Sequence, residues 1–402
     1  MKFLFLVHRY SKNIEGILEK DMIKVFSKNR HEISVVVPND RKNNEDTYIY
    51  NEEKIKVLYV KTGNYQNDVP RIEKIISVLT RNFLLKRVIK KYFKNEKFDY
   101  IVGYTPFMAD FNLIKNLKKC CKIFNIGLYY NSKTLLMLWD IFPQNAKDLK
   151  IIKNNFVFKY FKYKEKKMYE IFDKVVCNCE GQIEYILKNN FKEKEELLLV
   201  RNSEFIFNDN AEIKDSKKEK DITVIFGGNM GIPQKLENLM LMIKEMKNSN
   251  WVKFIFIGNG SEKNKLRKLK EELELENLQI LDQVSRFEYE NIIKQSNIAM
   301  ISLNENYTVP NFPAKVTGYC KVGIPIFASL DECSYKYLGK FITENNIGVI
   351  SKAGNIRDMK EKFLYLVNNL EKFSKEKIRE VYKSEFNINK AYETIMQEIK
   401  KD

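Results

Sequence analysis

The sequence is short of the residues that interrupt secondary structure or bind metals. It has 15 Gly, 8 Pro and 2 His among 402 residues, and its six cysteines show no C-x-x-C spacing of the kind that holds zinc. These cysteines are Cys120, Cys121, Cys177, Cys179, Cys320 and Cys333. They lie in apolar segments, so we expect buried, reduced thiols and no metal site.

Long apolar runs are also absent. No segment reaches the roughly 18 consecutive apolar residues that a membrane span requires. The apolar N-terminal run ends at His8 and Arg9, before any small-residue cleavage site, and is too short for a signal peptide. We therefore expect a cytoplasmic protein.

The charge is strongly unbalanced toward the basic side. Seventy Lys and Arg residues face 53 Asp and Glu residues, which gives a net charge of +17. Such an excess favours anionic partners, and nucleic acid, anionic lipid and nucleotide diphosphates all fit it. The 44% hydrophobic content is enough to fill more than one core in a chain of this length.

Apolar strands and helical stretches alternate through the first half of the chain. This pattern predicts a doubly wound α/β domain with a parallel sheet over residues 1–205. The polar, charged segment at 206–220 lacks apolar periodicity and is the expected linker. The strands we expect are Phe3–Val7, Glu32–Val37, Ile55–Val60, Tyr100–Gly103, Lys122–Ile126, Lys174–Cys177 and Leu197–Val200.

The same alternation resumes in the second half. It predicts a second α/β domain over residues 221–384, with helices at Gln234–Lys247 and Glu262–Leu273. Two such domains in tandem usually bind a ligand in the cleft between them, at the carboxyl ends of the strands. The strands we expect here are Ile222–Phe226, Val252–Ile257, Leu278–Leu281, Asn297–Ser302, Pro325–Ala328 and Gly348–Ile350.

One lysine stands where a helix should repel a cation. Asn311 or Phe312 is the expected helix cap, Pro313 suits the first helical position, and Lys315 then falls in the first turn. That end of a helix carries partial positive charge, so a lysine there is unfavourable unless an anion is shared with the free N–H groups. Lys315 therefore indicates a phosphate site, and a side chain directed into water is the alternative.

Two glycine-bearing turns follow neighbouring strands of the second domain. Glycines at a strand-to-helix turn let the backbone approach a phosphate. Lys235, expected just inside the helix after the first turn, could neutralise the same anion, or could be an ordinary surface lysine. Together with Lys315, the turns predict a nucleotide or sugar phosphate site. The residues of the two turns are Gly227, Gly228, Asn229, Met230, Gly231, Gly258, Asn259 and Gly260.

These segments carry a family resemblance. The runs IFGGNMGIPQKLENL, FIFIGNGSEKNKLRKL and NFPAKVTGYCKVGIPIFAS resemble the donor-binding domain of GT-B glycosyltransferases of family four. Within that group they most resemble bacterial capsule and O-antigen transferases of the N-acetylfucosamine-transferring kind. The resemblance is thinner in the first half, where it includes SKNIEGILEKDMIKVFSKNRHEISVVVP and LMLWDIFPQNA.

The resemblance implies a GT-B fold and transfer of a sugar from a UDP-sugar, without a cofactor or metal, to an acceptor held by the first domain. Gly227 to Gly231 would meet the diphosphate or sugar, and Lys315 with Lys235 would neutralise phosphate. Asp282 and Val284 would border the base. Such enzymes are generally retaining, and their last helix, here 385–402, crosses back to the first domain.

One family feature is missing. Many members carry two glutamates eight positions apart, and the second often contacts the ribose. Here the matching positions are Pro310 and Gly318. Ribose recognition must therefore come from elsewhere, and Glu305 is one candidate.

The first domain offers candidates for the acceptor side. His8 ends the first strand at the edge that should face the cleft, either as a catalytic group or as a structural histidine. Asp140 could orient the acceptor hydroxyl or assist its deprotonation, and capping of the next short helix is the alternative role. The expected acceptor-binding residues are Tyr10, Glu15, Gly16, Trp139 and Asp140.

Two stretches carry cations among aromatic residues, Arg81–Phe98 and Phe156–Phe172. As amphipathic helices they could lie on an anionic leaflet beside a lipid-linked acceptor. The alternative is a pair of ordinary helices that pack their aromatic residues inward. We expect weak peripheral contact with the inner face of the plasma membrane.

Three functions remain in competition. The first is a glycosyltransferase of polysaccharide assembly. The second is a GT-B nucleotide-sugar 2-epimerase, which would need catalytic carboxylates and a histidine, whereas the second half contains no histidine. The third is a basic nucleic-acid-binding protein, which the charge supports without any recognised binding motif.

Overall fold

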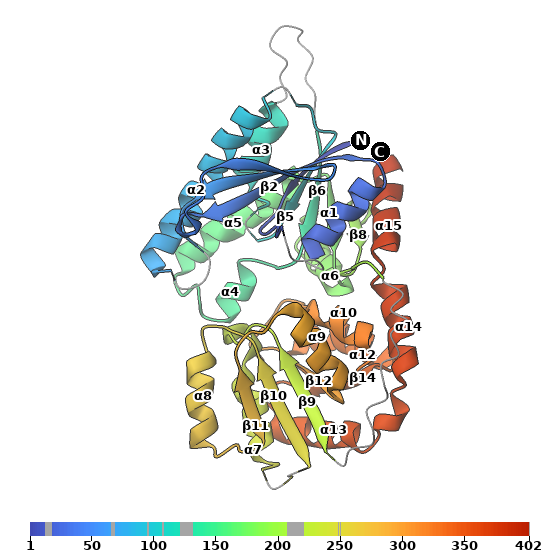
Figure 1. Ribbon diagram of the computed structural model, residues 1–402. Helices are drawn as coiled ribbons and strands as arrows, with labels where there is room; N and C mark the ends of the chain where they lie inside the picture. Colours follow the sequence, from blue (N-terminus) through green and yellow to red (C-terminus); the bar gives the residue numbers. More distant parts are fainter. Residues whose placement is uncertain are drawn as a thin grey trace.

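The computed structural model describes residues 1–12, 18–65, 69–94, 96–106, 108–120, 132–206, 221–247, 249 and 251–401. Two α/β domains follow one another along the chain, and each is built on its own sheet (Figure 1). The predicted pair of Rossmann-like domains is therefore confirmed. The predicted linker lies almost entirely outside the described residues.

The first sheet has eight strands in the order β3-β4-β2-β1-β5-β6-β7-β8. Every neighbouring pair is parallel except β3 and β4. Its central strands are continuous apolar runs because helices cover both faces of a parallel sheet. The strands are β1 (Lys2–Leu6), β2 (Glu32–Asp40), β3 (Tyr48–Glu52), β4 (Ile55–Thr62), β5 (Tyr100–Tyr104), β6 (Lys133–Leu138), β7 (Lys174–Cys177) and β8 (Leu197–Leu199).

Two strands of this sheet were not predicted. β3 is an antiparallel edge strand that turns directly into β4 at Glu53, whose φ is 54°. Its polar, half-exposed sequence lacks the apolar run that marks a buried strand. β6 is an apolar run in which the sequence analysis placed no strand. The strand that we expected at Lys122–Ile126 lies outside the described residues.

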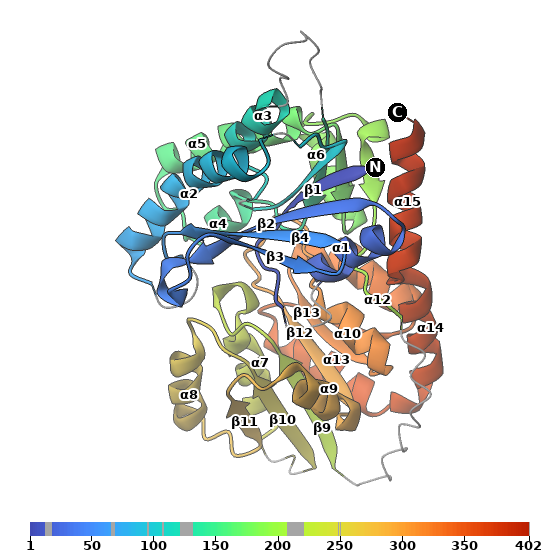
Figure 2. The ribbon, with the colours of Figure 1, turned by 45° about the horizontal axis from the view of Figure 1, so that its top comes forward.

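Helices cover both faces of the first sheet. Figures 1 and 2 show α2, α3 and α5 together on one side, and α1 with the C-terminal helix on the other. The helices are α1 (Leu18–Lys28), α2 (Arg71–Tyr92), α3 (Phe111–Cys120), α4 (Gln144–Asp148), α5 (Asn155–Ile171) and α6 (Glu180–Lys188). Among the described helices, none combines the length and hydropathy needed to cross a bilayer.

The second sheet has six parallel strands in the order β11-β10-β9-β12-β13-β14. The strands are β9 (Ile222–Gly227), β10 (Val252–Ile257), β11 (Leu278–Leu281), β12 (Ile298–Ser302), β13 (Ile326–Leu330) and β14 (Gly348–Lys352). The helices are α7 (Leu236–Lys244), α8 (Lys263–Glu272), α9 (Arg286–Gln295), α10 (Lys315–Val322), α11 (Glu332–Ser334), α12 (Lys340–Glu344), α13 (Ile356–Val367) and α14 (Lys375–Glu385).

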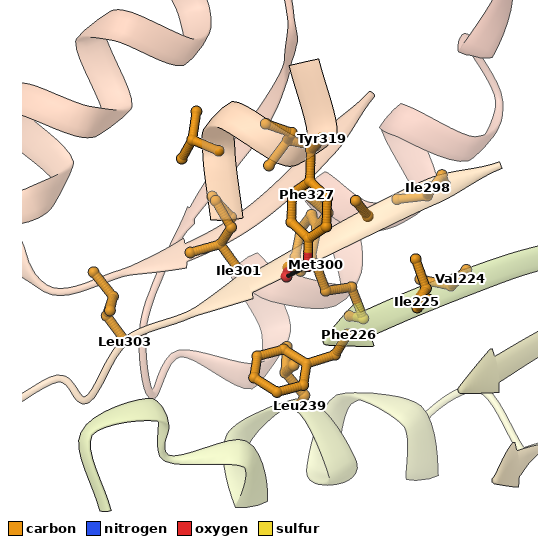
Figure 3. Packing of buried hydrophobic residues seen from close by; sticks show 14 of the residues in the cluster. Val224, Ile225, Phe226, Leu239, Ile298, Met300, Ile301, Leu303, Tyr319 and Phe327 are labelled. Atoms are coloured by element: carbon orange, nitrogen blue, oxygen red, sulfur yellow. Dashed lines mark hydrogen bonds between the residues drawn. The ribbon is translucent and has the colours of Figure 1, made fainter. Parts of the chain in front are cut away.

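Buried side chains of the second domain's hydrophobic core pack around the carboxyl end of β9. Phe226 is fully buried near the end of β9, and Figure 3 shows its ring beside Leu239 of α7. Tyr319 of α10 is equally buried, and its hydroxyl donates to the carbonyl of Met300 on β12 (3.3 Å). The backbone after β9 therefore rests on closely packed side chains that hold it in place.

The C-terminal segment spans both domains. α14 packs against α10, and α15 (Ile388–Lys401) packs against α1 in the first domain (Figure 1). Ile388, Ile395 and Ile399 belong to the first domain's hydrophobic core. Tyr392 of the same helix holds the His31 ring, with its hydroxyl 2.9 Å from Nε2. This histidine is thus part of the packing between a strand, a helix and the C-terminus.

Three of the four described cysteines are buried as expected, and Cys333 is not. Cys177, Cys179 and Cys320 are buried and free, and Cys333 is half-buried and free. Burial raises the pKa of the Cys179 thiol to about 11, so this group stays protonated at neutral pH. The side chains of Cys120 and Cys121 lie outside the described part of the chain.

Candidate functional site

The order of the second sheet creates a binding position at its centre. β9 and β12 are neighbours at the centre of the sheet. The strand that follows β9 in the chain, β10, lies on one side of this pair, and the strand that follows β12, β13, lies on the other. In open parallel sheets, ligands bind outside the carboxyl ends of the strands at such a switch point. Here those ends are Gly227 and Ser302. The first glycine turn and the loop leading to Lys315 therefore border the same position.

The two glycine turns are packed directly onto each other. The amide of Met230 donates to the carbonyl of Asn259 (2.8 Å), and the amide of Gly228 donates to the carbonyl of Ile257 (2.9 Å). A Cβ on Gly258 would lie 1.9 Å from the Gly228 carbonyl oxygen, and one on Gly260 would lie 2.4 Å from that of Met230. Glycine is therefore required in the second turn for the two backbones to meet.

The first turn also leaves space above its backbone. Gly228 has φ of 119°, and the nearest atom to a Cβ built there is the Lys315 amine, 3.6 Å away. Asn229 is exposed, and its Nδ2 donates to Oε1 of Gln234 (3.1 Å). That same oxygen accepts from the amide of Gly231 (3.3 Å). The turn is thus fixed by its own side chains while Gly228 faces the lysine.

Lys235 does not lie inside the helix as predicted. It has left-handed backbone geometry (φ 44°) and is the residue before α7. A short 3₁₀ turn covers Ile232–Gln234 and includes Gln234, the predicted first residue of the helix. Lys235 therefore stands between the glycine turn and α7, close to the switch point, and its role in binding phosphate stays a prediction.

The helix start at Lys315 also differs from the prediction. α10 begins at Lys315 itself, Ala314 precedes it, and no side chain caps its N-terminus. Pro313 is therefore not the first helical residue. Neither predicted cap is available, because Asn311 Nδ2 donates to the Val309 carbonyl (3.1 Å) and the Phe312 ring packs into the core. The uncapped N–H groups of α10 remain next to the lysine.

The Lys315 side chain is directed toward the glycine turn rather than into bulk water. Its Nζ lies 3.8 Å from the centre of the Phe226 ring. Among the residues that the structure describes, no carboxylate lies within ion-pair distance of it. Burial without a counter-charge lowers the pKa of this amine to about 7. A bound anion would supply the missing charge.

Asp282 has a definite structural partner. Its Oδ1 accepts from Lys263 Nζ (2.5 Å) and Arg267 Nη2 (3.3 Å), and Lys263 lowers the pKa of the carboxyl group. The buried Lys263 also donates to the Gly258 carbonyl (2.6 Å). Asp282 thereby anchors the second glycine turn, a role that sequence reasoning missed. Val284 packs against the core, and contact of either residue with a base stays a prediction.

His8 lies beyond the end of β1 and is held by a neighbouring loop. Its Nε2 is 2.9 Å from the carbonyl oxygen of Thr105, the residue after β5. Burial lowers the pKa of the His8 imidazole to about 4, so the ring is neutral at pH 7 and its Nε2–H donates to that oxygen. The backbone amide of His8 donates to Oε1 of the buried Glu19 (3.1 Å). Burial also raises the pKa of the Glu19 carboxyl group to about 7.

Asp140 is positioned by the same threonine. Thr105 Oγ1 accepts from the amides of Trp139 (2.9 Å) and Asp140 (3.1 Å). The alternative role as a helix cap is excluded, because Pro143 precedes α4 and no side chain caps that helix. Asp140 is accessible to solvent, yet the protein around it raises the pKa of its carboxyl group by desolvation. Thr105 thus joins the loops that carry His8 and Asp140.

The remaining acceptor candidates differ in their surroundings. Tyr10 is buried, and its carbonyl accepts from the Tyr59 hydroxyl (2.5 Å). Trp139 packs edge-on against Tyr104, with ring centres 5.0 Å apart. Glu15 and Gly16 lie outside the described residues. Contact of any of them with an acceptor stays a prediction.

The two halves of the site are connected across the domains. Asp148 at the end of α4 accepts from the amide and the hydroxyl of Thr308, both at 2.8 Å. Ile141, next to Asp140, and Leu149, directly after α4, belong to the second domain's core. Asp140 therefore lies on the side of the first domain that meets the Lys315 loop. No cluster of three potential metal ligands occurs in the described ranges.

Residues 208–383 match the protein family described as "Glycosyl transferases group 1". With the two-domain fold, this match supports a glycosyltransferase enzyme. A search of curated proteins found no match.

Solved structures share the fold over the whole chain at low identity. Sucrose-phosphate synthase from Thermosynechococcus elongatus has a TM-score of 0.73 at 12% identity, covering 100% of this chain and 98% of that one. Anabaena HepE in complex with UDP-glucose has a TM-score of 0.67 at 12% identity, covering 100% of both chains. WaaG, a glycosyltransferase involved in lipopolysaccharide biosynthesis, has a TM-score of 0.63 at 12% identity, covering 97% and 98%. The GT-B fold is thereby confirmed.

Proposed function

We propose that this protein transfers a sugar from a UDP-sugar to an acceptor bound by its first domain. The observation that carries the proposal is Lys315, a partly enclosed amine beside an open glycine turn, with no carboxylate partner in the described part of the chain. A diphosphate would lie against Gly228 and accept from Lys315 and the uncapped N-terminus of α10. UDP and UDP-glucose are bound in the Anabaena HepE structures, which supports a uridine donor.

The chemistry that fits these residues is electrostatic stabilisation of the departing diphosphate. As the bond between the sugar and phosphate breaks, negative charge grows on the phosphate oxygens, and Lys315 is placed to offset it. In a retaining, metal-independent reaction, the leaving phosphate takes the proton of the acceptor hydroxyl. Asp140 would orient that hydroxyl. The neutral His8 is held away from proton transfer at Nε2 by its bond to Thr105.

We further propose an acetamido sugar such as N-acetylfucosamine as the donor sugar, and an acceptor used in capsule or O-antigen assembly. The Asn311-Phe312-Pro313 sequence before Lys315 supports this branch of the family. The acceptor would be lipid-linked or an oligosaccharide. The similarity of fold to a glycosyltransferase of lipopolysaccharide biosynthesis is in keeping with such a role.

Nucleotide release tests the function. The purified protein would be incubated with a panel of UDP- and GDP-sugars, with and without lipid-linked acceptors, and UDP and GDP would be measured. Acceptor-dependent UDP release is expected, and it should be abolished in Lys315→Met. Conversion of the UDP-sugar to an epimer without acceptor would instead identify an epimerase. Salt-sensitive binding of nucleic acid without binding of UDP would overturn the proposal.

We also propose weak peripheral contact with an anionic membrane. α5 exposes Phe156, Tyr160 and Tyr163, and α2 exposes Phe83, so aromatic side chains and lysines share these surfaces. Liposome sedimentation at low salt should show binding to anionic vesicles that neutral vesicles do not show. Equal recovery of the protein with both kinds of vesicle would remove this part of the proposal.

A further inference from the structure

A small cavity lies at the carboxyl ends of the central strands of the first sheet, and we call it the strand-end cavity. Its volume is about 20 Å³. Tyr104 is the last residue of β5 and Asn178 directly follows β7, and both line the cavity. β6 lies between these two strands, and the loop that carries Asp140 leaves the sheet from its end. The cavity therefore lies beside the base of that loop.

The register of the strands brings the lining side chains to one face of the sheet. Tyr104 pairs with Met137, and Met137 pairs with Val176. Directly paired residues of neighbouring strands point to the same face, as do residues two positions apart in one strand, so Asn178 continues the row that Val176 begins. All four residues line the cavity, and two apolar side chains of α1 complete the wall on this face.

Two polar atoms at the cavity lack a hydrogen-bond partner within the described part of the chain, the hydroxyl of Tyr104 and Oδ1 of Asn178. Tyr104 is 0% exposed and Asn178 is 4% exposed. The backbone of Asn178 is satisfied, because its amide donates to Gln182 Oε1 (2.8 Å) and its carbonyl accepts from Arg201 Nη1 (3.4 Å). Buried polar atoms are almost always hydrogen-bonded, so both side chains call for a partner that the cavity can hold.

The chemistry of the two groups defines that partner. Burial raises the pKa of the Tyr104 phenol well above its ordinary value, so the hydroxyl keeps its proton and can donate. Asn178 Oδ1 can only accept. A molecule between them must therefore accept from one group and donate to the other, which a simple cation or anion cannot do. Water does both, and a cavity of roughly 10–15 Å³ is enough to hold one molecule.

A third partner is available on the segment that crosses to the second domain. Ser203 is buried and lines the cavity, and its hydroxyl donates to the carbonyl of Arg201 (2.9 Å). Its oxygen can still accept a hydrogen bond. Internal waters usually make about three hydrogen bonds, which matches this set of groups. The next residue, Glu204, is itself fixed, since its amide donates to the carbonyl of Phe386 (3.1 Å).

We infer that the strand-end cavity binds one ordered water molecule, which accepts from the Tyr104 hydroxyl and donates to Asn178 Oδ1 and Ser203 Oγ. The water joins the ends of β5 and β7 to the segment that crosses to the second domain. The site lies directly behind Trp139, whose ring packs edge-on against that of Tyr104 (5.0 Å). The inference does not depend on the proposed function.

A crystal structure of the full chain, at a resolution that shows ordered water, tests the inference directly. One water is expected at about 2.7–3.2 Å from both the Tyr104 hydroxyl oxygen and Asn178 Oδ1. A direct hydrogen bond between these two side chains would overturn the inference. Well-ordered side chains with no water between them would overturn it as well.

A pair of substitutions tests the same link in solution. Tyr104→Phe keeps the ring, and Asn178→Leu keeps the number of side-chain heavy atoms. Each change alone leaves the water and the other group one partner short, so the melting temperature should fall by about 2–6 °C. The double variant should lose clearly less than the sum of the two shifts, because neither polar group remains buried without a partner. Shifts that simply add would contradict the water bridge.

Tyr169→Phe is the matched control. Tyr169 is also 0% exposed, its hydroxyl also lacks a partner among the residues that the structure describes, and it is not part of the cavity wall. Its shift and that of Asn178→Leu should add. Equal non-additivity for Tyr169 and Tyr104 would mean that packing couples the sites, and the inference would fail. Circular dichroism first shows that each variant is folded; if one is not, the crystal structure of the unaltered protein decides.

Discussion

The amine of Lys315 lies 3.8 Å from the centre of the Phe226 ring, the last aromatic side chain before the glycine turn. The ring offers an ammonium group partial compensation through its negative face. It does not replace the water that the amine has lost, since burial lowers its pKa to about 7. Lys315 thus destabilises the unliganded protein whenever it is charged, which is the usual cost of a preformed binding site.

Replacement of Lys315 by methionine should separate stability from binding. The similar length of methionine preserves the contact with Phe226, while the loss of the charge should weaken UDP binding by about 1.5–3 kcal/mol, or roughly 10- to 150-fold. The melting temperature at pH 6 should rise. Calorimetry with UDP and differential scanning fluorimetry measure the two effects.

Lys340→Met is the control for this comparison, because Lys340 is a solvent-exposed lysine of α12 in the same domain. It should change neither quantity appreciably. The gain in melting temperature of Lys315→Met should shrink toward pH 10, because an amine with a lowered pKa destabilises the folded state fully below about pH 7 and progressively less as the pH approaches its unfolded value. A gain of equal size at pH 6 and pH 10 would contradict this explanation.

UDP binding should depend on pH through the same amine. A diphosphate favours the charged form of Lys315, whose pKa without ligand is about 7. Affinity should therefore fall as the pH rises above 7, and binding at pH 8 should take up a proton. Calorimetry in two buffers with different ionisation enthalpies measures the uptake. The slope and the uptake should both disappear in Lys315→Met, and identical affinities of the unaltered protein at pH 6.5 and 8.5 would rule the mechanism out.

Thr105→Val should disturb the acceptor side alone. Valine keeps the volume of the buried threonine but removes the oxygen that accepts from the amides of Trp139 and Asp140. Each orphaned amide costs about 1–3 kcal/mol, so the melting temperature should fall and kcat with acceptor should drop at least tenfold. UDP affinity should remain unchanged. Thr105→Ser retains the hydroxyl, so its melting temperature and its kcat with acceptor should equal those of the unaltered protein. If Thr105→Ser is as impaired as Thr105→Val, the hydroxyl group does not position the Asp140 loop.

Two glycines of the second domain should respond to alanine in opposite ways. Gly258→Ala places a methyl group 1.9 Å from the Gly228 carbonyl oxygen. Because that oxygen belongs to the backbone and cannot rotate away as a side chain can, the first glycine turn must shift, and UDP binding should be lost. Gly318→Ala, inside α10, meets nothing within 4 Å and should stabilise the protein by roughly 0.5–1 kcal/mol. Chemical denaturation and UDP titration of the two variants check the contrast. A destabilised Gly318→Ala would show that this position needs a glycine.

Strand positions were largely predictable because parallel strands buried on both faces are continuous apolar runs. Val252–Ile257 and Lys174–Cys177 were predicted at the bounds that the structure shows. β3 was missed because an antiparallel edge strand needs no such run. The helix start at Lys315 was misplaced because Phe312, taken as a cap, is drawn into a cluster with Phe341 and Phe386. That cluster joins segments far apart in the sequence.

Some residues of the candidate site were predictable from the sequence and others were not. Gly228, Gly258 and Lys315 could be found because their chemistry depends on local backbone geometry and on the order of strands. Thr105 and Lys263 could not, because their importance comes from contacts with loops 34 and 19 residues away. A single threonine after an apolar strand carries no signal of its own.

The sequence by itself determined the two α/β domains, the glycine turns and the presence of a lysine near the start of α10, since these follow from local apolar periodicity and from residue type. Only the tertiary structure decided the electrostatic state of the site. The pKa of Lys315 and that of His8 are both lowered by desolvation. Desolvation depends on how much protein surrounds a group, and that protein comes from segments that folding brings together from distant parts of the chain.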